Sequence, residues 1–162
     1  MSKKSPKWLE LAETFKGVAE IRGPKHNSII TGWLVKLRAW WRDDETPWCG
    51  VFVAYCMDAA GLPYPKYYMR AKAWADYGSL LQAGRLAQGA ILVFDRAGGG
   101  HVGFYVGEDA AYYYVLGGNQ GNAVSVMKIN KVRLVSSRWP KGVPVNGLPV
   151  YLTGGKVSVN EK

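Results

Sequence analysis

Apolar residues in the first half of the chain repeat at the spacing of helices. One stripe predicts an amphipathic helix over residues 7–17, whose apolar positions are Trp8, Leu11, Ala12 and Phe15. Similar patterns predict further helices over residues 29–40, 46–60 and 71–77. Gly61 and Gly78 follow two of these segments and are suitable helix ends.

The pattern changes after Gly89 to short β-rich runs separated by Gly, Asn and Asp. These runs predict strands over residues 91–94, 101–106, 112–116, 123–129 and 132–138. Helices followed by consecutive strands are typical of an α+β domain with an antiparallel sheet. We find no repeat or linker and predict one domain over residues 1–162, with a core over 8–140. The tail, 141–162, is expected to be either an extra edge strand or loosely held.

Composition indicates a folded, basic protein. The chain has 162 residues, of which 48% are hydrophobic, and includes 7 Trp and 10 Tyr, which favours a packed core over disorder. A net charge of +9 favours nucleic acid, anionic lipid or an acidic cell-wall polymer as a partner, with a merely solvated basic surface as the alternative. Mild basic clusters include Lys3, Lys4 and Lys7. No apolar run approaches a membrane span and no signal peptide is evident, so we expect synthesis in the cytoplasm.

The two cysteines differ in their surroundings. Cys49 and Cys56 are seven positions apart, a rise of ~10.5 Å on a helix, which is too far for a disulfide. Cys56 lies among apolar residues and is predicted to be a core residue. Cys49 falls near a helix start, with Thr46 as N-cap and Pro47 in the first turn. The free N–H groups and the helix dipole there favour a thiolate.

A thiolate nucleophile needs a base, and His101 in Gly-His-Val-Gly is the candidate. Asn119 follows the next predicted strand and is placed to orient the imidazole, as in a Cys-His-Asn triad. Each member also has a simpler explanation: a core cysteine, a structural histidine, and a turn asparagine. The combination of order and context favours catalysis.

These segments resemble the NlpC-type and CHAP-type (cysteine, histidine-dependent amidohydrolase/peptidase) cell-wall hydrolases. The helix start at residues 48–53 and the paired runs 89–94 and 100–107 are similar to the motifs of that group. Other segments resemble a phage and prophage branch: Glu20-Ile21, His26-Asn27, residues 71–74, 116–120 and 137–140. The likeness extends from about Trp8 to Pro140.

The resemblance implies a papain-like fold, in which the catalytic helix packs on the sheet, and cleavage of a peptidoglycan amide. Carried over by motif, Cys49 is the nucleophile, His101 the base and Asn119 the orienting residue. Gly117 stands where some relatives have a glutamate, so Asn119 is expected to suffice. We expect substrate contacts from Trp48, Trp74, Tyr68 and Gln120. No metal site is expected, because the acidic run 43–45 is too short for a calcium loop.

The leading interpretation is a phage endolysin that cuts a stem-peptide amide by acyl transfer without a cofactor. We expect a monomer that is made in the host cytoplasm and acts on peptidoglycan at the periplasm, aided by attraction to the anionic envelope. A secreted effector or toxin with the same chemistry is one alternative. A basic nucleic-acid-binding protein is another, but it leaves Cys49, His101 and Asn119 unexplained, so no specific nucleic-acid partner is expected.

Overall fold

The computed structural model describes residues 5–161, so Lys3 and Lys4 of the N-terminal basic cluster lie outside the described residues. Within that range the helices are α1 (Lys7–Thr14), α2 (Ser28–Lys36), α3 (Cys49–Ala59) and the 3-10 helices η1 (Ala71–Asp76), η2 (Ala83–Arg85) and η3 (Lys131–Arg133). No helix in the described part combines the length and the apolar character needed to cross a membrane.

The strands form one antiparallel sheet. They are β1 (Ser79–Leu80), β2 (Ile91–Arg96), β3 (Gly99–Glu108), β4 (Tyr112–Gly117), β5 (Ser125–Asn130) and β6 (Leu134–Trp139). Their order across the sheet is β1-β6-β2-β3-β4-β5. The predicted α+β class, with helices first and an antiparallel sheet after them, is confirmed.

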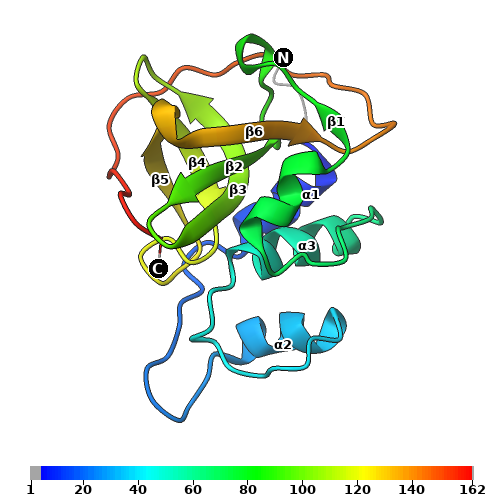
Figure 1. Cartoon of the computed structure of the whole chain (residues 1–162), viewed down its shortest axis with the longest axis vertical. Helices are drawn as coiled ribbons and strands as arrows, with labels where there is room; N and C mark the ends of the chain where they lie inside the picture. Colours follow the sequence, from blue (N-terminus) through cyan, green and yellow to red (C-terminus); the bar gives the residue numbers. More distant parts are fainter. Residues whose placement is uncertain (1–4, 162) are drawn as a thin grey trace.

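Helix α3 lies between the sheet and α2, with α1 beside it (Figure 1). Because it has neighbours on more than one side, α3 buries nearly all of its length. Its Phe52 ring meets Phe104 of β3 with centroids 6.1 Å apart, and both side chains are fully buried. Burying a side chain of this size stabilises the fold by roughly 1.5–3 kcal/mol. This packing fixes the start of α3 against the central strands.

The ends of the helices differ from the sequence predictions. Helix α3 begins at Cys49, not near Thr46, because the Asp43 carboxylate binds the Thr46 N–H and hydroxyl and holds that residue in the preceding turn. The predicted helix over 71–77 is a 3-10 helix, and α1 is shorter than expected. Cys49 therefore occupies the first helical position.

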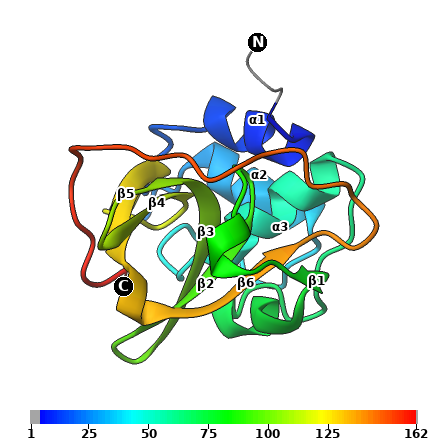
Figure 2. The same cartoon turned by 90° about the horizontal axis from the view of Figure 1, so that it is seen from above.

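The chain after β6 returns across the sheet edges. It makes isolated parallel bridges at Glu108↔Tyr151 and Lys128↔Val157. From above, this orange-to-red segment passes around the β5 side of the sheet (Figure 2). In Figure 1 its end lies beside the yellow loop that follows β4. The tail thus touches the strands at separate points and is not a continuous edge strand.

Candidate active site

The Cys49 thiol lies at the floor of a groove of about 860 Å³. It is 5% exposed, at the first position of α3. The first intrahelical bond runs from Phe52 N–H to Trp48 O, so the preceding N–H groups point free from the helix end. Gly50 allows this placement, since a Cβ there would lie 2.0 Å from the Tyr68 carbonyl oxygen. The helix start is therefore held closely against the backbone beside the groove.

His101 is fully buried on β3, and its Nε2 lies 2.9 Å from Gln120 Oε1. The Gln120 amide nitrogen donates to the carbonyls of Val115 (3.0 Å) and Ser125 (2.8 Å). Those bonds fix the amide orientation, because a carbonyl oxygen facing two carbonyls would repel them. Gln120 Oε1 is therefore the acceptor and His101 Nε2–H the donor. In the neutral ring this leaves Nδ1 unprotonated, as a base requires.

Nδ1 of His101 is buried without an aligned hydrogen bond among the described residues. The neighbouring group is the Cys49 thiol, and resting catalytic pairs are often poorly aligned until substrate binds. Burial alone raises the pKa of Cys49, but the hydrogen bonding and charge of His101 and the N–H groups of Val102 and Gly50 outweigh it. The pKa of the thiol is lowered overall.

The same pairing raises the pKa of His101. Burial favours the neutral ring, but the Cys49 thiolate, the Glu161 carboxylate and the Gln120 hydrogen bond outweigh that effect. Opposite shifts in two adjacent groups favour a thiolate–imidazolium pair. The structure thus brings together the two residues that the sequence suggested as nucleophile and base.

Asn119 does not contact the imidazole through an aligned hydrogen bond. Its Nδ2 donates to the Glu161 carbonyl at 2.8 Å, and its buried Oδ1 has no hydrogen-bond partner among the described residues. Asn119 has φ 61°, a left-handed conformation that turns the chain just after β4. The next side chain, Gln120, consequently faces the ring. The structure therefore corrects the expected site: the orienting amide is that of Gln120, which the sequence suggested as a substrate contact.

Gly117 marks the position where some relatives have a glutamate. A Cβ at Gly117 would lie 2.5 Å from Gln120 Oε1 and 3.4 Å from His101 Nε2. The Gln120 amide thus fills the space into which a side chain from position 117 would project. The Gln120 side chain can therefore occupy this position only because residue 117 is a glycine.

The other expected substrate contacts are also corrected, because the structure buries them. Trp74 is 0% exposed and donates to the Tyr68 carbonyl, and Tyr68 is itself 5% exposed. Trp48 is 1% exposed, and its Nε1 donates to Glu20 Oε1 at 2.8 Å. These residues form the walls behind the site and have little surface for substrate.

The groove is lined by other residues, of which the sequence had suggested only Tyr67. Trp40 is 88% exposed, and the groove also contains four cationic side chains: Lys66, Arg70, Lys72 and Arg96. The half-exposed Tyr67 ring lies 5.4 Å from Lys66 Nζ and 5.0 Å from Arg70 Cζ. Asp43 is the one carboxylate among the lining residues, and its oxygens are engaged by Glu45 and Thr46. The sequence signal was the interleaving of Lys, Tyr and Arg over residues 66–72.

His26, the other histidine, belongs to a structural cluster. The buried Asp44 carboxylate accepts hydrogen bonds from the backbone N–H groups of Ile21 and Asn27 and lies 3.1 Å from His26 Nδ1. The motifs at residues 20–21 and 26–27 therefore anchor the α1–α2 connection. Across residues 5–161, no three His, Cys, Asp or Glu side chains cluster as metal ligands would.

Cys56 is predicted to affect stability and not turnover. It is completely buried in α3, and burial raises the pKa of its thiol, so it is unreactive near neutral pH. Replacing Cys56 with Ser places a hydroxyl in an apolar site and should lower the free energy of unfolding by about 1–3 kcal/mol. Urea unfolding and peptidoglycan turnover measure the two effects. A Cys56→Ser variant that keeps its stability but loses turnover contradicts this assignment.

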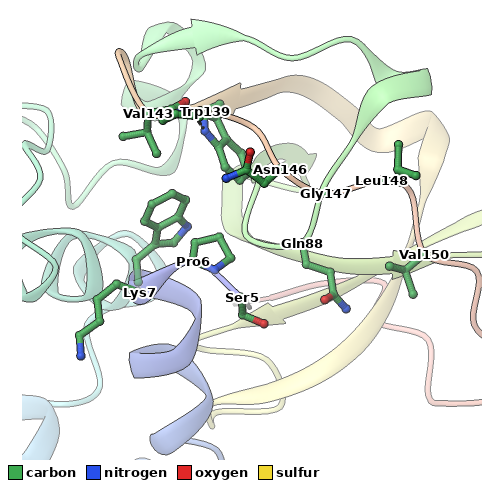
Figure 3. Close-up of a pocket in the computed structure, with 12 residues that line it drawn as sticks. Ser5, Pro6, Lys7, Gln88, Trp139, Val143, Asn146, Gly147, Leu148 and Val150 are labelled. Carbon is green, nitrogen blue, oxygen red and sulfur yellow. Dashed lines mark hydrogen bonds between the residues drawn. The ribbon is translucent and has the colours of Figure 1, made fainter. Parts of the chain in front are cut away.

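A second hollow, of about 510 Å³, lies away from the nucleophile, between the start of α1 and the segment after β6 (Figure 3). Neither Cys49 nor His101 lines it. Its wall includes Trp139, whose ring meets that of Trp8 edge to face at 5.2 Å. In Figure 3 the Lys7 side chain points away from the other labelled residues. We interpret this hollow as a gap left where the segment after β6 (residues 140–161, called the returning segment below) packs against the start of α1.

Comparison with protein families gives a match to part of the chain. Residues 41–119 match the family model described as the CHAP domain. The matched segment contains Cys49 and His101 and ends at Asn119. No curated protein matches the chain. The CHAP-type resemblance is thereby confirmed, while the phage branch stays a prediction.

Proposed function

We propose that this chain hydrolyses an amide of the peptidoglycan stem peptide through a Cys49 thioester. The match of residues 41–119 to the CHAP domain supports the proposal, because such domains are typical of cysteine, histidine-dependent amidohydrolases and peptidases. The observation that carries the proposal is that Cys49 lines an open groove and is paired with the buried His101, the two groups having opposite pKa shifts. A thiolate at a helix start beside an imidazolium is suited to acyl transfer.

Acylation proceeds from the ion pair. The Cys49 sulfur attacks the amide carbonyl carbon, and the carbonyl π electrons move to oxygen to give a tetrahedral oxyanion. Free backbone N–H groups at the start of α3 are placed to stabilise that charge. The His101 Nδ1 proton passes to the leaving nitrogen as the C–N bond breaks. An amine departs and a thioester remains on Cys49.

Deacylation reverses the roles. Neutral His101, held by Gln120 through Nε2–H, takes a proton from water at Nδ1. The hydroxide adds to the thioester carbonyl, and collapse of the second tetrahedral intermediate breaks the C–S bond. The product is a carboxylic acid, and Cys49 returns as thiolate beside protonated His101.

The charge of the groove favours an acidic peptide as substrate. Its four cationic side chains face one lining carboxylate, which is already hydrogen-bonded. Lys72 is offset in part by Asp95, 2.7 Å away, whereas Lys66 and Arg70 flank the Tyr67 ring. Stem peptides carry carboxylates, so attraction to this surface would concentrate and orient them near Cys49.

Reversal of one groove charge should weaken substrate use. We expect Arg70→Glu to lower kcat/KM on peptidoglycan by roughly fivefold at low ionic strength, with the difference shrinking at high salt because the side chain is exposed. Lys16→Glu, an exposed residue outside the groove, makes the same change in net charge and is the matched control. Equal losses in the two variants would show that only the overall charge matters.

The products of digestion test the proposed reaction. Purified peptidoglycan treated with the enzyme should yield fragments with one new amino and one new carboxyl terminus, identified by mass spectrometry. The position of those termini distinguishes an amidase from an endopeptidase. New reducing sugar ends, without new peptide termini, would exclude the proposal.

We also propose that the enzyme serves as a phage lysis enzyme, on the basis of the segments that resemble the phage branch. It would be made in the host cytoplasm and reach the wall when the inner membrane is opened. Expression in the cytoplasm should therefore lyse cells only after the membrane is permeabilised. Lysis in the absence of permeabilisation would contradict this role, and a neighbouring immunity gene would favour the effector alternative.

A further inference from the structure

A buried carboxylate from the end of the described chain lies behind the active site. The returning segment is attached to β5 by Lys128 N–H to Lys156 O and Ser158 N–H to Lys128 O, both 2.8 Å. It then brings Glu161 against the loop after β4, where the Glu161 carbonyl accepts the Asn119 amide. In Figure 1 this end of the chain lies next to that loop.

The Glu161 side chain is fully buried and fully hydrogen-bonded. Arg133 contacts both carboxylate oxygens, with Nη2 2.5 Å from Oε1 and Nη1 3.2 Å from Oε2. The Ser158 hydroxyl donates to Oε2 at 2.5 Å. A buried ion pair usually gains little stability over apolar packing, because both charges lose their hydration. Its presence here calls for an explanation other than stability.

The charge of Glu161 reaches His101. The carboxylate is among the groups that raise the pKa of His101, and His101 in turn helps to lower the pKa of Glu161. Among the described residues, the charged or titratable groups that act most strongly on the ring are Cys49 from α3 and Glu161 from the returning segment, whose charge Arg133 partly offsets, while Gln120 is neutral. A neutral amide orients the ring but supplies no charge. The negative charge absent at Gly117 thus has a source elsewhere in the chain.

We propose that Glu161 is a positioning residue of this active site: it holds the loop of Asn119 and Gln120 in place and supplies the buried negative charge that favours the protonated form of His101. This inference rests on the proposed cysteine mechanism. It assigns to the returning segment a part of the site that the CHAP match, which ends at residue 119, does not include.

The test measures how fast Cys49 is alkylated across pH, which needs no peptidoglycan. Iodoacetate is anionic and reacts fastest while the adjacent imidazolium is charged, so its rate falls as His101 loses its proton. Glu161→Gln keeps the size of the side chain and removes its charge. The alkaline limb of the iodoacetate profile should move to lower pH by roughly half a unit or more. In Glu161→Asp, which keeps the negative charge, the alkaline limb should stay close to its wild-type pH.

Glu108→Gln is the matched control. Glu108 is another buried carboxylate, bound to Lys131 Nζ at 2.6 Å and to the Tyr105 hydroxyl, at the opposite end of β3 from His101. It should lower stability without moving the alkaline limb. An unchanged limb in Glu161→Gln, or equal shifts in both variants, would overturn the proposal.

A double replacement covers the case in which Glu161→Gln does not fold. Arg133→Met with Glu161→Leu removes both charges and leaves neither unpaired, a change that buried pairs often tolerate. It should fold and move the limb in the same direction, by less than Glu161→Gln does because the opposing Arg133 charge is removed as well, and an unchanged limb would again overturn the inference. Absence of peptidoglycan cleavage by the wild type would count against the proposed function alone, because the alkylation profile would still report on Glu161.

Discussion

Replacement of Cys49 by alanine is expected to abolish cleavage of peptidoglycan amides. The variant loses the sulfur that forms the thioester, and the remaining groove and N–H groups can only bind the substrate. We expect kcat to fall by at least about 10³-fold. Cys49→Ser should be nearly as inactive, because His101 is paired to a thiol of lowered pKa, whereas the pKa of a serine hydroxyl is far higher and it would not ionise there. Release of new amino termini from peptidoglycan measures the loss.

The fold should survive that change, so circular dichroism and the unfolding midpoint should stay close to wild type. Cys56→Ala is the matched control, as it removes the same atom about two turns further along α3, where the thiol packs in the core. It should keep its activity. If Cys49→Ala clears peptidoglycan at the wild-type rate, the nucleophile assignment is wrong.

The sequence predicted the fold class because the hydrophobic periods of the main elements are strong, although it missed the short strand β1. The change from helical spacing to short β-rich runs at Gly89 identified an α+β protein correctly. It could not place the start of α3, because Thr46 and Pro47 have good intrinsic preferences for a helix start. A side chain from the preceding turn, Asp43, captures Thr46 instead. Such competition depends on the three-dimensional turn and is not visible in propensities.

The proximity of Cys49 and His101 was predictable because regular elements bring these two residues together. His101 on β3 and Cys49 on the helix packed against that strand were brought together by regular structure. The orienting amide follows a left-handed residue, Asn119, and it is the Gln120 side chain that reaches the ring while that of Asn119 binds the Glu161 carbonyl. Glu161 reaches the site through a segment with few regular hydrogen bonds, so no periodicity could indicate it.

The sequence also could not distinguish aromatic residues that line the groove from those that pack in the core. Trp74 and Tyr68 were plausible substrate contacts because aromatic side chains suit both cores and grooves. The structure buries them and exposes Trp40 and Tyr67 at the groove. Tyr67 and Tyr68, adjacent in sequence, thus divide between surface and packing according to the path of the 62–70 loop.

Removal of the base is expected to have the second largest effect and to change the pH dependence of the site. In the wild type the pKa of Cys49 is lowered and that of His101 is raised, so the ion pair exists in the pH window between them. The plot of activity against pH should be bell-shaped, because activity rises as the thiol ionises and falls as the imidazolium loses its proton. His101→Ala removes the main partner that lowers the pKa of the Cys49 thiol, so the effect of burial, which raises that pKa, dominates. Turnover should fall about 10²- to 10⁴-fold.

The alkylation rate separates this explanation from loss of structure. Without His101 the Cys49 thiolate should form only at alkaline pH, so reaction with iodoacetamide near pH 7 should slow and increase steadily as the pH rises. His26→Ala is the matched control, because it removes the other histidine, which lies beside Asp44 and away from the groove. The His26→Ala variant should be less stable but should keep the bell-shaped dependence of activity on pH. A His101→Ala enzyme with an unchanged bell would mean that another group is the base, whereas a shift confined to this variant ties the reactivity of Cys49 to the ring that Gln120 holds.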